Sequence, residues 1–355
     1  MRSLSVLATE ISDIYADGIL KKGPMHIAIK ECFTGYIQSF HIRGILAHYG
    51  ATGRKEWLEG AKLWADWSIR MQGTYGDPAA YNMGYLFETE NGIPKSWFIA
   101  DTMDQAMALL NVAHLLDPGD PLYGRIIDSI LRFDTYIQKW NLGDDGFALG
   151  YMDGENLDKQ SYHCAVARGI SYYSAMSIVF GSAIFKARGI TLVRHMLLHD
   201  DFKSNYHGSP LTNRCYASFA LTDAYYVLAA GDDVLMAEVL KKMQDYIIPW
   251  AIENQTEEGY WIHDRFEGQP GATKPKQKKG IGPYTWGLLY GLEVFSSLLP
   301  KDENLQTMID KSYNYMESSL EPGDVNRWGH HAWGTMAIAA RLYPETIFPM
   351  RASVK

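Results

Sequence analysis

The feature that most constrains the fold of this chain is a repeated sequence pattern. An aromatic-rich, strongly apolar helix is followed by a more polar one, about six times along nearly the whole length. A helical hairpin of this kind buries its apolar face only against neighbouring hairpins. The closed solution is an all-α fold, an (α/α)6 toroid. An open α-solenoid is the alternative, but it requires a fixed repeat length, and the connections here vary from a few residues to about thirty.

Hydrophobic periodicity predicts about twelve helices. The segment 33–49 (FTGYIQSFHIRGILAHY) is apolar around most of its circumference, while 53–72 has charged residues between its tryptophans. This difference predicts an inner and an outer ring of helices. The expected spans are 3–20, 26–50, 53–72, 97–116, 120–140, 160–181, 183–199, 210–231, 233–252, 281–299, 302–319 and 330–342.

The composition favours one folded domain over residues 1–355. Hydrophobic residues make up 47% of the chain and charged residues 21%, and no linker-like stretch divides it, so it can bury one large core. The net charge of −8 gives no electrostatic footprint for nucleic acid or for an anionic membrane. We expect neither as a partner, and the oligomeric state stays open.

Cofactors and targeting signals are also not indicated. Cys32, Cys164 and Cys215 lack the spacing of a zinc site or a disulfide framework, and no HExxH-type motif is present, so we expect no metal or other cofactor. The N-terminal segment has acidic residues where a signal peptide needs an apolar core, and no apolar run reaches membrane-spanning length. This predicts a cytoplasmic protein, although a periplasmic or secreted one lacking its signal peptide would look the same.

Long connections between hairpins indicate where function resides, because long loops in compact domains usually carry it. We predict that they form an active-site rim at one mouth of the toroid. Aromatic rings there can stack on sugars while their polar edges bind hydroxyls, although any single aromatic can equally be core. The long connections are 73–96, 141–159, 200–209, 253–280 and 320–329, and the predicted aromatic sugar contacts are Trp97, Tyr151, Tyr162, Tyr284, Trp286, Trp328 and Trp333.

Three aspartates are the candidates for acid–base catalysis. Asp101 and Asp104 lie three residues apart on one helical face at the opening of an apolar inner helix, which would direct them toward the central cleft. Helix capping or compensation of the helix dipole is the alternative. Asp153 follows an apolar run and precedes Gly154, which would hold its carboxylate out into the cavity. We predict a catalytic role for Asp153.

Arg168 opens an otherwise small and aromatic helix, where a solvated role has little support from its neighbours. An arginine in a sugar cleft most simply binds a carboxylate through its bidentate fork. A buried ion pair with a loop acid is the other interpretation. The remaining predicted substrate contacts are Arg214, His163, His207 and His331.

Three segments in this order resemble a known family: WFIADTMDQAMALL at 97–110, GYMDG at 150–154 and ARGISYYSAM at 167–176. They are similar to segments of the unsaturated uronyl hydrolases, six-hairpin glycosidases that remove a 4,5-unsaturated uronic acid from oligosaccharides. The resemblance implies that Asp153 is the catalytic aspartate and Asp101 its partner. Arg168 and Gly169 match the Arg-Gly pair of the third segment.

The resemblance also implies a mechanism and a substrate, a uronic-acid-containing oligosaccharide. An acid protonates C4 of the C4=C5 bond, a carboxylate activates water for attack at C5, and the resulting hemiketal opens and expels the aglycone. Two other classes stay open. A polysaccharide lyase or sugar epimerase on the same toroid would use His, Tyr and Arg side chains, and a non-catalytic carbohydrate-binding protein would have a cleft without perturbed titratable groups.

Overall fold

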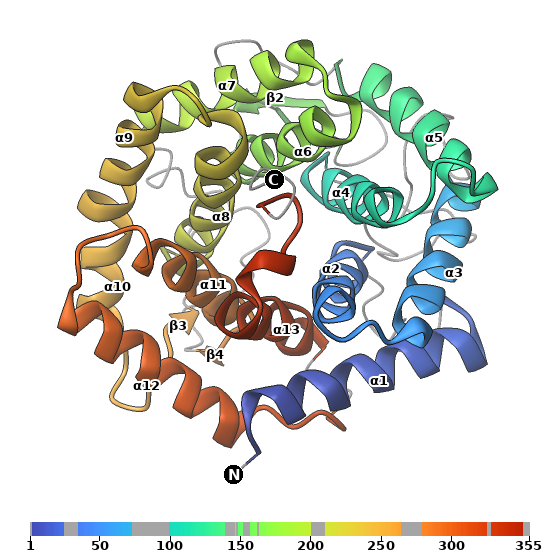
Figure 1. Ribbon diagram of the computed structural model, residues 1–355. Coiled ribbons are helices and arrows are strands. Elements are labelled where there is room, and N and C mark those ends of the chain that lie inside the picture. The colour runs from blue at the N-terminus through green and yellow to red at the C-terminus, as the bar shows by residue number, and fades with distance from the viewer. Residues whose placement is uncertain are drawn as a thin grey trace.

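The computed structural model describes residues 2–24, 35–72, 99–138, 146, 148–151, 157–161, 163–199, 210–263, 279–324 and 328–350. Its helices form two concentric rings (Figure 1). The inner ring consists of α2 (Gly35–Thr52), α4 (Ile99–Leu115), α6 (His163–Phe180), α8 (Pro210–Asp223), α11 (Tyr284–Ser296) and α13 (Trp328–Leu342).

The outer ring consists of α1 (Leu4–Lys22), α3 (Lys55–Met71), α5 (Pro121–Ile137), α7 (Ala183–Leu198), α9 (Asp233–Lys242), α10 (Ile248–Asn254) and α12 (Glu303–Ser319). A π-helical turn, Met243–Ile247, joins α9 to α10, and a second one, Ala224–Leu228, extends α8. Each inner helix packs on the next, and α13 packs on α2, which closes the ring. The predicted all-α (α/α)6 toroid is therefore confirmed.

Burial separates the two rings as the sequence predicts. In the inner helix α4 every residue from Ile99 to Ala113 is buried. The outer helix α3 buries only one face, at three- and four-residue spacing, because its other face meets solvent. Small residues let the inner helices approach closely. A Cβ on Gly44 would lie 2.3 Å from the Thr335 hydroxyl oxygen, so this crossing of α2 and α13 requires glycine.

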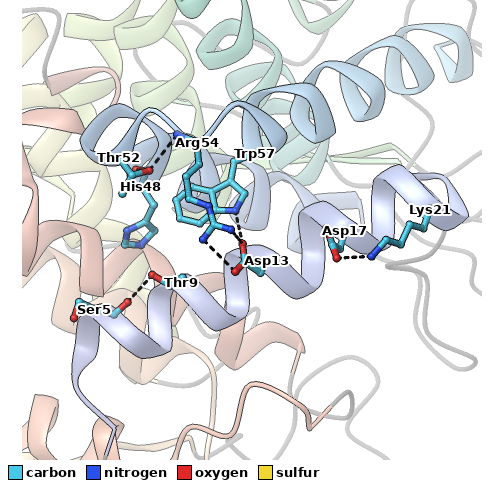
Figure 2. Close-up of polar contacts among 9 residues, drawn as sticks. All are labelled: Ser5, Thr9, Asp13, Asp17, Lys21, His48, Thr52, Arg54 and Trp57. Atoms are coloured by element: carbon cyan, nitrogen blue, oxygen red, sulfur yellow. Dashed lines mark hydrogen bonds and ion pairs between the residues drawn. The ribbon is translucent and has the colours of Figure 1, made fainter.

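Polar contacts fasten the first three helices together (Figure 2). The Trp57 indole N–H at the start of α3 donates to the Asp13 carboxylate of α1 at 2.8 Å, and Arg54 forms an ion pair with the same carboxylate at 2.8 Å. Thr52, at the end of α2, donates to the His48 carbonyl oxygen at 2.9 Å. The two contacts to Asp13 fix where α1 crosses the turn between α2 and α3.

Two predicted connections contain strands that the sequence pattern did not indicate. β1 (Ala148–Tyr151) pairs with β2 (Leu157–Ser161), and β3 (Ile262–His263) pairs with β4 (Lys279–Ile281), both antiparallel. Strands of two to five residues leave little alternation for a sequence reading to detect. A 3₁₀ turn, Pro344–Thr346, follows α13. Among the described helices, none combines the length and apolarity needed to cross a membrane.

Candidate active site

The inner helices run parallel, so their N-termini lie at the same end of the toroid. The evidence is that residues at the same position in four of these helices, the sixth from the N-terminus, lie close together near the centre. They are Phe40 of α2, Asp104 of α4, Arg168 of α6 and Trp333 of α13. The Phe40 and Trp333 rings stack at 3.9 Å, and the Arg168 guanidinium lies 4.8 Å from the Phe40 ring. In the sequence, each long connection precedes an inner helix.

Beside this layer, toward the N-termini, side chains from five elements gather, and we call them the mouth cluster: Asp101, Cys164, Tyr216, Tyr284, Thr212 and His263. Asp101 belongs to the first turn of α4 and is 8% exposed. Burial raises the pKa of Tyr284 to about 12, a hydrogen bond with Tyr216 lowers it, and the Asp101 carboxylate raises it further. Asp101 therefore lies within electrostatic reach of the Tyr284 phenol.

His263 of β3 closes the other side of the mouth cluster. Its Nε2 lies 3.1 Å from the Thr212 hydroxyl, and its ring centre lies 4.9 Å from that of Tyr284. The Tyr284 and Tyr216 rings are 5.7 Å apart in an edge-on arrangement. A carboxylate, two phenols and an imidazole thus converge on one place, with ring faces and hydroxyls suited to a sugar.

A buried ion pair lies directly beneath the mouth cluster. Arg168 Nε is 3.0 Å from Asp104 Oδ2, and both side chains are almost fully enclosed. Four aromatic rings, those of Phe40, Tyr216, Phe219 and Trp333, surround the guanidinium at 4.4–5.9 Å. Burial raises the pKa of Asp104 to about 6, although the charges of Arg168 and Arg43 lower it. We call this pair and the four rings around it the floor of the mouth.

The sequence-predicted residues divide between the mouth, the floor and other parts of the fold. Asp101 and Tyr284 belong to the mouth cluster. Asp104, Arg168 and Trp333 belong to the floor. For Arg168 the geometry matches the second interpretation of the sequence, a buried ion pair, with the difference that its partner is an inner-helix acid rather than a loop acid.

Four other predicted substrate contacts have partners within the scaffold. Arg214 stacks on Tyr246 and Trp250 of the outer ring at 4.8 and 4.4 Å. His331 bonds to the Tyr15 hydroxyl and to the Glu321 carbonyl oxygen. The Trp286 indole N–H donates to His330 at 3.2 Å, and His163 Nε2 lies 3.3 Å from the Asn213 carbonyl oxygen.

The rest of the predicted set lies outside what the structure describes. This holds for Asp153, Trp97, Tyr162 and His207, and for the side chains of Tyr151 and Trp328. The predicted pairing of Asp153 with Asp101 stays a prediction. Among the residues that are described, no three His, Cys, Asp or Glu side chains are arranged to hold a metal ion.

Sequence reasoning missed Tyr216, Arg43 and Asp223 as residues of the centre. For the two charged residues a signal was present: each is a charge inside an inner helix that is apolar nearly all round, in FHIRG and in SFALTD. Such a charge is buried when the helix is, and buried charges are paired or functional.

Comparisons with known proteins support the architecture. No protein-family model matches the sequence, and no curated protein matches it. A glycosyl hydrolase family 88 protein from Bacteroides vulgatus superposes with a TM-score of 0.63 and 14% identity, covering 96% of this chain and 99% of that one. The chain has the fold of the six-hairpin glycosidase superfamily.

Other solved structures share the fold. A D-mannose isomerase superposes with a TM-score of 0.68 and 9% identity, over 95% of this chain and 97% of that one. A sugar epimerase from a ruminal bacterium gives 0.65 and 12%, over 96% and 99%. At these identities the likeness establishes the architecture, and the chemistry has to be argued from the site.

Proposed function

We propose that this chain is a carbohydrate-active enzyme that performs acid–base chemistry at the mouth cluster, with Asp101 as the proton-transferring group. The observation that carries the proposal is the placement of Asp101. Its carboxylate opens an inner helix within electrostatic reach of Tyr284, and ring faces and hydroxyls for holding a sugar lie around it. A partly enclosed carboxylate of this kind suits general acid–base catalysis.

The specific reaction we propose is removal of a terminal, 4,5-unsaturated uronyl residue from an oligosaccharide. This specificity derives from the resemblance of the segments around Asp101, Asp153 and Arg168 to the unsaturated uronyl hydrolases. Asp101 and Asp153 would divide two tasks, protonation at C4 and activation of the water that attacks C5. Because Arg168 lies in the floor, we assign it to supporting the mouth rather than to direct contact with the uronate.

The test uses an unsaturated uronyl disaccharide and follows loss of the absorbance of its conjugated C4=C5–carboxylate system. Asp101→Asn preserves the volume of the side chain but cannot transfer a proton, so kcat/KM should fall by about 100-fold or more. The matched control is Asp128→Asn on the exposed face of α5, which should leave activity unchanged. Full activity in Asp101→Asn would remove this residue from the mechanism, and an inert wild type would remove the uronyl specificity.

A second candidate is isomerisation or epimerisation of a free sugar. His263, held by Thr212 beside Tyr284, favours it, since an imidazole and a phenol can exchange a proton at a carbon next to a carbonyl. Isomerases and epimerases also occur among the proteins with this fold. Incubation of reducing sugars in D₂O distinguishes the candidates. Deuterium incorporation at C2 that is lost in His263→Gln would identify an epimerase or isomerase. In a separate assay, new absorbance of the C4=C5–carboxylate system formed from a saturated polymer would identify a lyase.

A further inference from the structure

Four charged side chains are buried beneath the mouth within electrostatic reach of one another, one from each of four successive inner helices. We call them the central charge cluster: Arg43 of α2, Asp104 of α4, Arg168 of α6 and Asp223 of α8. None is more than 1% exposed. Their signs alternate around the ring, so each charge has a neighbour of opposite sign.

The contacts show that the four act on one another. Arg168 forms the ion pair with Asp104, and its guanidinium shares the Phe40 ring with Arg43, at 4.8 and 5.5 Å from the ring centre. Burial raises the pKa of Asp223 to about 6, the charges of Arg43 and Arg168 lower it, and the charge of Asp104 raises it. Arg43 has no hydrogen-bond partner among the described residues, so its effect on the two carboxylates is electrostatic.

The cluster is connected to the mouth through Arg168. Its guanidinium lies 4.4 Å from the centre of the Tyr216 ring. The Tyr216 hydroxyl in turn hydrogen-bonds to Tyr284 and to the Cys164 thiol. Movement of Arg168 would therefore displace two phenols of the mouth cluster. An ionised Asp104 balances the charge of the Arg168 guanidinium, whereas a neutral Asp104 leaves that charge buried and uncompensated.

We propose that Arg43 and Asp223 are positioning residues of the sugar site: their charges set the pH range in which Asp104 stays paired with Arg168, and that pair holds Tyr216 and Tyr284 in place. The link to catalysis rests on the proposed function. The link to the geometry of the mouth does not.

The groups that face Asp104 come from three neighbouring helices. They are Arg168 and Cys164 from α6, Arg43 from α2, and Asp223 and Cys215 from α8. Burial raises the pKa of both thiols, so they stay neutral. Within this set only Asp104 and Asp223 change charge between about pH 4 and pH 7.

Two variants should shift the pKa of Asp104 in opposite directions. Arg43→Met removes a positive charge. The acid limb of the pH profile of kcat/KM, where activity falls as Asp104 is protonated, should therefore move to higher pH by on the order of one unit. Asp223→Asn removes a negative charge, so the limb should move to lower pH. Arg43→Lys should restore the wild-type limb. Arg188→Met, which breaks a half-buried pair with Asp134 away from the centre, should not move it.

Thermal midpoints measured against pH give a readout that needs no activity. In the wild type, the pKa values of Asp104 and Asp223 are higher in the folded state than in the unfolded state. Between about pH 4 and pH 6 the native state therefore binds more protons than the unfolded state. The free energy of unfolding consequently falls as pH rises through that window. Arg43→Met should enlarge this loss and Asp223→Asn should reduce it. Midpoint shifts that are equal at pH 5 and pH 8, or of the same sign in both variants, would overturn the proposal.

The positioning step is read separately from ring-labelled tyrosine NMR, with Tyr284→Phe for assignment. Near pH 7, Asp104 of the wild type, with its pKa of about 6, is mostly ionised, whereas a pKa about one unit higher leaves much of it protonated in Arg43→Met. At this pH, Arg43→Met should move the Tyr284 resonances and Arg188→Met should not. If Arg43→Met does not fold, Asp223→Asn carries the same test, since it should keep the wild-type Tyr284 signals down to a lower pH. Tyr284 signals that do not move would contradict the positioning role of Arg43 and Asp223. Moved signals in a protein without sugar turnover would support it and remove only the proposed function.

Discussion

At the scale of single residues, the environment of Arg168 decides its role. A guanidinium between four aromatic rings and one carboxylate has no free face to offer a substrate. Such a pair adds little net stability compared with an apolar replacement of both partners, but removal of one partner leaves a buried, uncompensated charge. Arg168 and Asp104 should therefore behave as a unit.

Arg168→Met should accordingly destabilise the protein by about 3–5 kcal/mol in urea unfolding at neutral pH, because Asp104 is left unpaired. The double variant Arg168→Met/Asp104→Leu should recover much of that loss. Any residual effect on turnover should be equal for charged and neutral sugars. A stable Arg168→Met variant that loses activity only on uronates would instead assign Arg168 to the substrate carboxylate.

At the scale of helices, close approach between inner helices depends on glycine at particular crossings. A Cβ on Gly287 of α11 would lie 2.3 Å from the Cys215 sulfur and 2.5 Å from a ring carbon of Trp333. Both neighbours are buried and belong to the layer that contains Arg168. The crossing of α11 with α8 and α13 cannot accept a side chain without moving that layer.

Gly287→Ala should therefore cost about 1–3 kcal/mol of stability, the range for overpacking a core. The control is Gly124→Ala on the outer helix α5, where a Cβ would meet nothing within 4 Å. That change should stabilise by about 0.5–1 kcal/mol, because alanine favours a helix interior. Thermal or urea unfolding of both variants checks the opposite signs, and a neutral Gly287→Ala would show that this layer can adapt.

At the scale of the whole molecule, the ring is closed by contacts between its first and last helices. His331 of α13 has Nε2 at 2.9 Å from the Glu321 carbonyl oxygen, so this nitrogen carries the proton. Nδ1 is then the acceptor, and the buried Tyr15 hydroxyl of α1 donates to it at 3.0 Å. The predicted substrate contact at His331 is, in the structure, part of the closure between α1 and α13.

Tyr15→Phe should leave the buried Nδ1 of His331 without its donor and cost about 1–3 kcal/mol. Tyr123→Phe on the outer helix α5 is a suitable control, since its half-buried ring is retained and it lies away from this closure. Equilibrium unfolding in urea measures both. Equal losses in the two variants would mean that the closure does not depend on this hydrogen bond.

The sequence by itself determined the helices, their division into two rings and the closed architecture. These follow from local information, because the apolar period of a segment fixes its helix and the width of its apolar face fixes its ring. The positions of Asp101 and Asp104 at the opening of an inner helix were readable for the same reason.

Only the tertiary structure decided which charges meet. Arg43, Asp104, Arg168 and Asp223 are far apart in the sequence, and closure of the ring buries them within electrostatic reach of one another. The tertiary structure also places Arg168 and Trp333 in the floor of the mouth. It places Arg214 against the outer ring. The partner of a buried charge depends on helices that are distant in sequence, and no local pattern encodes that choice.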